Sequence, residues 1–516
     1  MSSIALHVAL LSGEQIAISR SPHSTIGALI EVVQKEFQKP VGKLISASGD
    51  RLLESATLAQ AGIRENDVVT AVVQDVAVAA TSAAFAAIRA NGTVVAWGCP
   101  KRGGDCSAVQ DQLQNVQRLQ ATDHAFAAIL GDGSVVSWGE PSFGGNSSAI
   151  QRELHGVCQI QATETAFAAI REDGAVVTWG DAFCGGDCSA VRDQLHSVQH
   201  IQSNPSAFAA LRADGRVVTW GAFFLGGDSN HVCDELQDVL QVCGGLCGFA
   251  AIKAGGRIVF WGPMSYQGVH ETGLDGITQV QFNVRHWAAA TQEGHLALSL
   301  RLCDQPDLRV PSGVLSVPDC AASLAWGGLH DIIILQKDGM VQFWGEGVPE
   351  WLRKELTSVV RLRCGSNELP KCAAVRSDGS VVAWQFSDKG AIFDVSAHEH
   401  KQLQNVTDVQ STYGGAFAAL RGDGTVVTWG RAISGGDSAA VQGQLRGVVA
   451  IQATWWAFAA IRSDGSVVSW GCPGHGGDSS RVRDQLGQAT VDQETTPKPR
   501  AGKPKVKSVL KKPSRK

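Results

Sequence analysis

The chain has 516 residues, of which 44% are hydrophobic, and a formal net charge of −5. No run approaches 18 consecutive apolar residues, and the N-terminus lacks the basic stretch and apolar core of a signal peptide, so neither a membrane span nor an export signal is predicted. Thirteen scattered cysteines, an odd number, indicate a reduced compartment rather than a disulfide framework.

The first 76 residues predict a small domain with the element order ββαββ. Two short strands, IALHVALL and EQIAISR, flank a turn at Ser12-Gly13. A helix follows, with Ser24-Thr25 as its N-cap, apolar residues at helical spacing up to Phe37, and an end before Pro40. The strands KLISA and VVTAVVQ complete the segment.

This order of elements and the stretch LISASGDRLLESATLAQAGIRENDVVTAVV resemble ubiquitin, which implies a β-grasp domain over residues 1–76. The chain runs on through Gln74 where ubiquitin ends in Gly-Gly, so conjugation as a tag is not expected. The apolar recognition face of ubiquitin corresponds here to Leu11, Ser46 and Val72, with a serine at its centre. The resemblance implies ubiquitin-pathway partners, whereas a domain that only packs against its neighbour is the alternative.

Residues 77–486 repeat a pattern of the type A-F-A-A-[IL]-R-x-D-G-x-V-V-x-W-G. Most tryptophans of this pattern are 41 residues apart. One gap of 83 residues contains a unit that has Leu300 near the tryptophan position, so about ten units are predicted. The repeated tryptophans are expected to pack between units, and they are Trp97, Trp138, Trp179, Trp220, Trp261, Trp344, Trp384, Trp429 and Trp470.

Each unit reads as a strand, a β-hairpin and a short helix. Asp-Gly or Asn-Gly at the hairpin, as in Asp132-Gly133, predicts a type I′ turn with φ > 0 at both positions. A Gly-Gly-Asp loop follows Trp-Gly, and in the first unit Asp105 is the expected N-cap of a helical stretch, CSAVQDQL. A calcium site needs six or more oxygen ligands, so one Asp per unit favours the turn and cap.

The recurring G-x-V-V-x-W-G signature resembles the repeats of the regulator of chromosome condensation family, which form β-propellers. The predicted fold is therefore mainly β, with a propeller-like ring of about ten units after the β-grasp domain. Family repeats are longer and close at seven, so an open or superhelical stack is the alternative. Units five to eight, about 240–400, depart from the pattern, and either sequence drift or a partner surface explains this.

Residues 487–516 form a Pro/Lys-rich tail that is predicted to be disordered. From Lys498 onward there are nine Lys/Arg and no Asp or Glu, which leaves −14 for residues 1–497. The tail fits an import signal, a weak nucleic-acid or chromatin contact, or a solubilising terminus. Its basic candidates are Lys503, Lys505, Lys507, Lys511 and Lys512.

No catalytic triad, carboxylate pair, phosphate loop or zinc-ligand spacing stands out, so no enzyme activity, cofactor or metal is predicted. The hypothesis is a non-catalytic scaffold that binds proteins, located in the cytoplasm, the nucleus or both, with no membrane partner. The resemblance implies one alternative, a chromatin-associated guanine-nucleotide exchange regulator of a small GTPase. The exchange residues of that family have no recognisable match in this chain.

Overall fold

The structure is a computed structural model, and it describes residues 3–486 apart from short gaps. These gaps are 11–12, 38–40, 51, 53–55, 74–75, 90–91, 264–266, 283–286, 292–295, 299–313, 317–329, 337–338, 346–349, 365–370, 388–389, 394–400 and 464. The tail, including its five lysine candidates, and Leu11 therefore lie outside the described residues.

The N-terminal domain is a four-stranded sheet with one helix packed against it. The strand order is β2-β1-β4-β3, with β1 and β4 parallel and the other pairs antiparallel. This agrees with the predicted order of elements, whose bounds are β1 Ile4–Leu10, β2 Gln15–Arg20, α1 Ile26–Phe37, β3 Val41–Ile45 and β4 Val68–Val73.

Helix α1 begins where the sequence predicts. The Thr25 hydroxyl accepts a hydrogen bond of 3.1 Å from the backbone N–H of Ala28, which is one of the donors left free at a helix start. Ile26, Leu29 and Val33 lie on one face of the helix and are fully buried. They pack on strand residues such as Leu6 in a core that belongs to this domain alone.

Ten small antiparallel sheets follow, one for each predicted unit. Eight of them have three strands, each adjacent to the next in sequence. Seven of these eight are β5 Ala77–Ala80, β6 Ala84–Ile88 and β7 Val94–Gly98; β8 Val116–Ala121, β9 Ala125–Leu130 and β10 Val135–Gly139; β11 Val157–Ala162, β12 Ala166–Arg171 and β13 Val176–Gly180; β14 Val198–Ser203, β15 Ala207–Arg212 and β16 Val217–Gly221; β21 Ile277–Phe282, β22 Trp287–Thr291 and β23 Leu296–Leu298; β31 Val406–Ser411, β32 Ala416–Arg421 and β33 Val426–Gly430; β34 Val448–Ala453, β35 Ala457–Arg462 and β36 Val467–Gly471.

The remaining three sheets lie in the degenerate part of the array. Two of them add a fourth strand. The elements are β17 Val239–Gly245, β18 Gly248–Lys253, β19 Arg257–Trp261 and β20 Gly268–Glu271; β24 Val314–Ser316, β25 His330–Gln336 and β26 Val341–Gly345, followed by helix α3 Glu350–Glu355; β27 Val359–Cys364, β28 Lys371–Arg376, β29 Val381–Ser387 and β30 Gly390–Phe393.

The prediction of a type I′ turn at the hairpins is wrong. In the second unit Gly133 has φ of 78°, whereas Asp132 is not among the residues with positive φ. The Gly133 N–H donates to Leu130 O at 2.9 Å, as in a type I turn followed by a left-handed glycine. Asp132 favours this turn because its carboxylate accepts from the N–H and the hydroxyl of Ser134 at 2.9 and 2.6 Å.

Packing between units uses the repeated aromatic residues. Phe126 and Trp138 of the second unit stack at 5.2 Å and pack on alanines and Ile88 of the first unit. Eight of the nine repeated tryptophans are buried, and the side chain of the ninth, Trp344, lies outside the described residues. Each unit therefore completes the core of its neighbour.

The Gly-Gly-Asp loop fits between two units because it lacks side chains at two close approaches. In the first unit Gly103 has φ of 88°, and a Cβ there would lie 2.6 Å from the ring of Phe126 in the next unit. A Cβ on Gly104 would lie 2.6 Å from the carbonyl carbon of Gly98. Asp105 accepts from the Ser107 N–H at 2.9 Å, in a turn just before the 3-10 helix Ser107–Gln112. The N-cap of this helix is Cys106 and not the expected Asp105.

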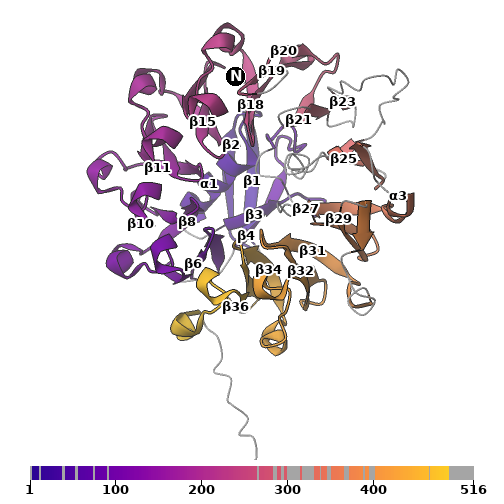
Figure 1. The fold of residues 1–516 in the computed structure, drawn as a ribbon. Helices are drawn as coiled ribbons and strands as arrows, with labels where there is room; N and C mark the ends of the chain where they lie inside the picture. The colour runs from indigo at the N-terminus through magenta and orange to yellow at the C-terminus, as the bar shows by residue number, and fades with distance from the viewer. Residues whose placement is uncertain are drawn as a thin grey trace, which may run out of the picture.

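The first and last units meet, so the ten sheets form a propeller-like ring (Figure 1). Strand β34 contacts β5, and Leu486 packs in one core with Phe85 and Trp97. The Trp97 Nε1–H donates to Gly476 O at 3.1 Å, as Trp138 Nε1–H donates to Gly103 O at 2.9 Å inside the array. The seam between the ends thus repeats an internal junction.

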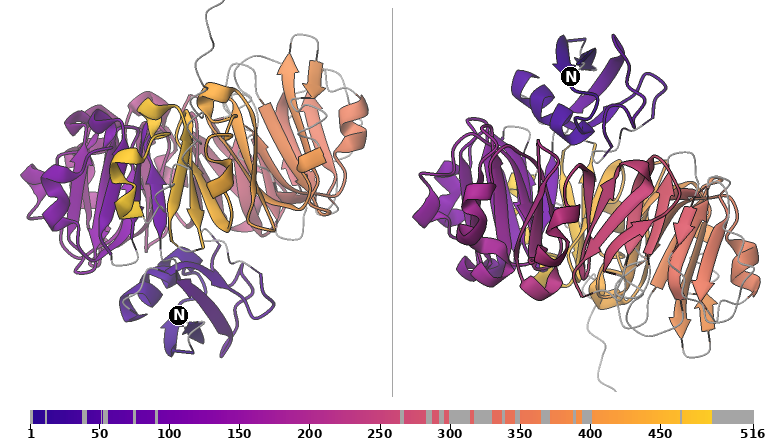
Figure 2. Two further views of the ribbon diagram at one scale, coloured as in Figure 1. Left: turned by 90° about the horizontal axis from the view of Figure 1, so that it is seen from below. Right: turned by 90° about the horizontal axis from the view of Figure 1, so that it is seen from above.

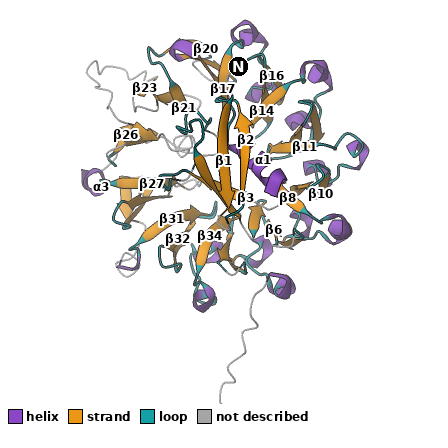
Figure 3. Cartoon of the chain, turned by 180° about the vertical axis from the view of Figure 1, so that it is seen from behind, coloured by secondary structure: helices purple, strands orange, loops and turns teal. Residues whose placement is uncertain are grey.

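The N-terminal domain lies on one face of the ring, over its centre (Figures 2 and 3). Strand β5 runs from this domain toward the turn at Thr81–Ala83, so Val76 enters the array at the end of the sheets where the hairpins lie. A Cβ on Gly465, in the hairpin of the last unit, would lie 3.4 Å from Val76. The domain is therefore on the hairpin face, and the described turns between the first two strands, in units one to five, nine and ten, form the opposite face.

Candidate functional site

In units one to five, nine and ten, the turns that join the first and second strands line the mouth of the central channel. In the second unit this turn is held by Thr122, whose hydroxyl donates to Phe143 O at 2.9 Å and accepts from the Ala125 N–H at 3.0 Å. Threonines at 81 and 163 make the same two contacts. The Thr454 hydroxyl donates to His475 O at 2.9 Å and accepts from the Trp456 N–H at 3.4 Å. The turn is fixed on both sides, so the residue after the threonine is free to vary.

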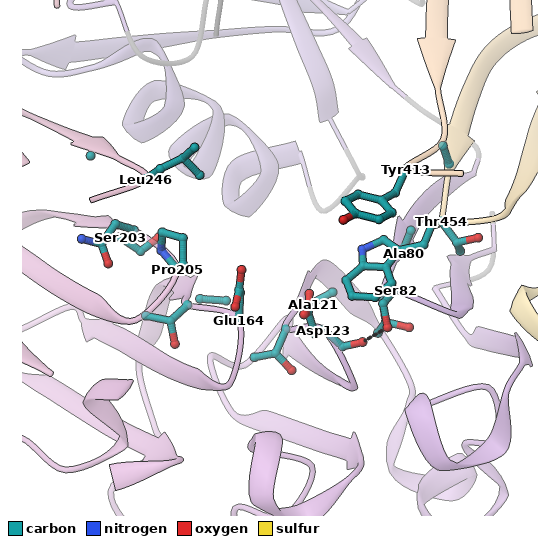
Figure 4. Close-up of a pocket in the computed structure, with 18 of the residues that line it drawn as sticks. Ala80, Ser82, Ala121, Asp123, Glu164, Ser203, Pro205, Leu246, Tyr413 and Thr454 are labelled. Carbon is teal, nitrogen blue, oxygen red and sulfur yellow. Dashed lines mark hydrogen bonds between the residues drawn. The ribbon is translucent and has the colours of Figure 1, made fainter. Parts of the chain in front are cut away.

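Backbone hydrogen bonds join these turns from one unit to the next. The Ser82 N–H donates to Asp123 O at 3.0 Å, the Asp123 N–H to Glu164 O at 2.8 Å, and the Glu164 N–H to Pro205 O at 2.9 Å. Across the seam the Trp455 N–H donates to Ser82 O at 3.0 Å. The mouth is therefore a rigid rim whose side chains surround a cavity of about 690 Å³ (Figure 4).

One side of the mouth is acidic. Burial raises the pKa of the Asp123 carboxyl, although the Arg102 guanidinium acts against this rise. Burial also raises the pKa of Glu164, and the nearby charge of Asp123 adds to the increase. Arg102 donates to the Ser82 hydroxyl at 3.0 Å and is positioned by it. Burial disfavours the charged form of both carboxyl groups, and a cationic ligand placed beside them would stabilise that form.

The other side of the mouth is aromatic. The rings of Tyr413 and Trp455 lie 5.2 Å apart and are tilted by 30°, and their residues are 46% and 38% exposed. The Gly414 N–H donates to Trp455 O at 2.8 Å, which ties the two loops together. Exposed aromatic faces beside carboxylates can hold a Lys or Arg side chain by cation–π attraction.

Three phenylalanines form an exposed patch on the same face of the ring, further from the axis. Phe183, Phe223 and Phe224 are 53%, 66% and 48% exposed, and Phe224 contacts the other two rings at 5.6 and 5.3 Å. This phenylalanine patch is tied to the mouth, because Asn204 Nδ2–H donates to Leu225 O at 2.6 Å. Contiguous exposed apolar side chains of this kind mark interaction surfaces.

The predicted recognition face of the N-terminal domain is only partly described. Ser46 and Val72 are half-buried. Val72 alternates along β4 with the fully buried Val69 and Ala71, which places it on the face of the sheet away from α1. The Ser46 hydroxyl lies 2.8 Å from the Ser48 hydroxyl and accepts from the Asp50 N–H at 3.1 Å. Its polar contacts are local, within its own turn.

The mouth and the phenylalanine patch were missed by sequence reasoning. The signal for the mouth is a variable position in the turn between the first two strands, which reads Ser82, Asp123, Glu164, Pro205, Leu246, Tyr413 and Trp455. The signal for the patch is separate: Phe183, Phe223 and Phe224 stand two or three positions after the glycine of Trp-Gly, where the other regular units have Pro, Ala, Lys, Ser, Ile or Gly. Tabulating the variable positions of the repeat, rather than the constant ones, would have found them.

In the described part of the chain, no three His, Cys, Asp or Glu side chains are grouped closely enough to hold a metal ion. Burial raises the pKa of the Cys243 thiol to about 12, so this half-buried cysteine is protonated and weakly nucleophilic at neutral pH. No helix in the same part of the chain has the length and apolar character needed to cross a bilayer.

Comparison with known proteins gives structural similarity at low identity. No family model and no curated protein matches the chain. Among solved structures, Prp20p from Saccharomyces cerevisiae is 14% identical over 73% of this chain and 92% of its own, with a TM-score of 0.30. The computationally designed Ika8 protein is 14% identical over 69% and 96%, with a TM-score of 0.29.

A Caldiarchaeum subterraneum ubiquitin is similar to a small part of the chain. It is 18% identical over 14% of this chain and 95% of its own, with a TM-score of 0.14. At such identities and TM-scores, function has to be argued from the geometry of the site.

Proposed function

We propose that the chain is a non-catalytic scaffold that binds a protein partner through the mouth face of its ring. The observation that carries the proposal is the phenylalanine patch, where Phe183, Phe223 and Phe224 are exposed and touch one another. Aromatic side chains grouped on a surface are typical anchors of protein interfaces. The patch stands on loops hydrogen-bonded to a rigid rim, so little conformational entropy is lost on binding.

A lipid surface fits this face less well than a protein. Residues 1–497 carry −14, and the two carboxylates at the mouth lie on the face that a membrane would have to approach. Anionic lipids would repel such a surface. A protein segment that is both apolar and basic matches the phenylalanines and the acidic mouth together.

The test is a quantitative capture experiment with the full chain. Serines replace the patch in the variant F183S/F223S/F224S. The matched control places three serines at exposed apolar positions in the first strands of other units, as L240S/V360S/V449S. Partners identified by mass spectrometry should be lost from the patch variant and kept by the control. Equal recovery of the same partners by both variants would exclude the patch as the binding surface.

We further propose that the N-terminal domain links the scaffold to the ubiquitin pathway. The support is its helix-covered four-stranded sheet together with the sequence resemblance to ubiquitin. Val68 and Val72 lie on the face of β4 away from the helix, so V68S/V72S in the full chain should reduce recovery of ubiquitin-pathway proteins. If the wild-type chain recovers no ubiquitin-pathway proteins either, this link is excluded.

A nucleotide-release assay distinguishes the scaffold function from the competing function, guanine-nucleotide exchange on a small GTPase at chromatin. The scaffold proposal expects no acceleration of release from candidate GTPases by the full chain. Acceleration that increases with chain concentration would favour the exchange function and exclude a purely non-catalytic role.

A further inference from the structure

The channel mouth combines two features that recognise one kind of side chain. Tyr413 and Trp455 offer aromatic faces at one side of the cavity, and Asp123 and Glu164 lie on neighbouring units at the other (Figure 4). A cation between them would gain from both the ring quadrupoles and the carboxylate charge. The mouth therefore fits an extended segment that is rich in lysine or arginine.

This chain carries such a segment itself. Residues 498–516 contain nine Lys/Arg and no acidic residue, whereas residues 1–497 carry −14. We infer that the tail of the same chain binds in the channel mouth, with one cationic side chain against the Tyr413–Trp455 pair and others at Asp123 and Glu164. Bound there, the tail would compete with partners that bind the mouth face. This regulatory role of the tail rests on the proposed scaffold function.

The position of the seam makes this contact possible. Leu486 packs on the first unit at the junction of the two ends, and Trp455 and Ser82 flank the same junction at the mouth. From Leu486 to the mouth, the tail would run along the length of one strand, about 20 Å, and across three spacings between neighbouring strands, about 15 Å. The twelve residues from Leu486 to Lys498 can span roughly 40 Å when extended, which is enough.

Tethering also gives the tail an advantage over a free competitor. A short flexible linker presents its segment at an effective concentration in the millimolar range. A mouth of only micromolar affinity for a basic peptide would therefore be mostly occupied by the tail of its own chain. A partner would have to exceed this local concentration or bind the tail itself.

The experiment measures binding of a fluorescent peptide of residues 498–516 by anisotropy at low salt. The full chain is compared with a full-length variant whose tail lysines are neutralised, K503Q/K505Q/K507Q/K511Q/K512Q. We expect the variant to bind the peptide at least about tenfold more tightly, because its mouth is vacant, and the difference should not depend on protein concentration. Equal binding by the two chains would overturn the inference, as would a difference that grows with protein concentration, which indicates exchange between copies.

Mouth substitutions in the lysine-neutralised chain place the contact. W455A and D123N/E164Q should each weaken peptide binding at least about fivefold. The matched control D111N/D193N removes two exposed carboxylates from the outer 3-10 segments and should leave binding unchanged. If D111N/D193N weakens peptide binding as much as D123N/E164Q does, binding depends only on total charge, and the inference is overturned. The F183S/F223S/F224S variant should still bind the peptide, because the phenylalanine patch is not part of the mouth. A failure of the partner-capture experiment can therefore be distinguished from a failure of the tail inference.

Discussion

The closing junction of the ring can be tested by a single methyl group. Gly476 has φ of 92°, and a Cβ there would lie 2.6 Å from the ring of Phe85 in the first unit. In Gly476→Ala the left-handed backbone costs about 1–2 kcal/mol. Overpacking against a fully buried ring costs about 1–3 kcal/mol more. The expected loss in the free energy of unfolding is therefore about 2–5 kcal/mol.

Two further glycines provide the controls. Gly144 occupies the equivalent place at an internal junction, with φ of 88° and a Cβ position 2.6 Å from the Phe167 ring. Gly474 lies in the same closing loop as Gly476, but a Cβ there would meet nothing within 4 Å. Gly144→Ala should match the loss of Gly476→Ala, and Gly474→Ala should have almost no effect.

The assay is denaturant unfolding followed by tryptophan fluorescence, because the repeated tryptophans are buried only while the units remain packed. Gly476→Ala and Gly144→Ala should lower the midpoint by similar amounts. If Gly476→Ala behaves like Gly474→Ala while Gly144→Ala is destabilised, the first and last units do not pack together. The closed ring would then be refuted without affecting the internal junctions.

Three other predictions follow from the packing and the pKa shifts. Leu486→Ala should lower the free energy of unfolding by about 2–5 kcal/mol, measured by the same unfolding assay, because this leucine is buried at the closing junction. Hydrogen bonds from Ser134 lower the pKa of the Asp132 carboxyl. The charged carboxylate therefore stabilises the fold above the ordinary carboxyl pKa of about 4, and this stabilisation is lost as the pH falls below that value. Asp132→Asn should therefore make the free energy of unfolding less dependent on pH on the acid side of a stability–pH profile. Iodoacetamide at neutral pH should modify the exposed Cys233 in the native chain and leave Cys243 unmodified, as peptide mapping would show.

The periodic part of the fold could be predicted from the sequence because each residue type does the same task in every unit. Tryptophan and phenylalanine recur where a neighbour must be packed, and Gly-Gly recurs where two backbones approach too closely for a Cβ, as at Gly104. The hairpin turn was predicted wrongly because Asp-Gly suits two turn types. The choice between them depends on the hydrogen bonds from Ser134 to Asp132, which a two-residue motif does not contain.

The mouth could not be found by a local motif search, because its members belong to different units. Asp123 and Glu164 are 41 residues apart, and Trp455 approaches them only because the ends of the array meet. A local motif search tests neighbours in sequence, whereas this site depends on ring closure and on the number of units. The phenylalanine patch likewise depends on two successive loops lying side by side.

The junction between Trp97 and Gly476 also removes the need for special capping units at the two ends of the array. A linear stack of repeats needs two specialised ends to shield its outermost apolar faces from water. Here every repeat has a neighbour on both sides, so any of the outer loops is an equally good place for the chain to start. A circularly permuted array, joined across the present ends and cut between Phe224 and Asn230, should fold to the same ring, with some loss of stability because the Gly226 carbonyl in the cut loop accepts from the Trp261 Nε1–H.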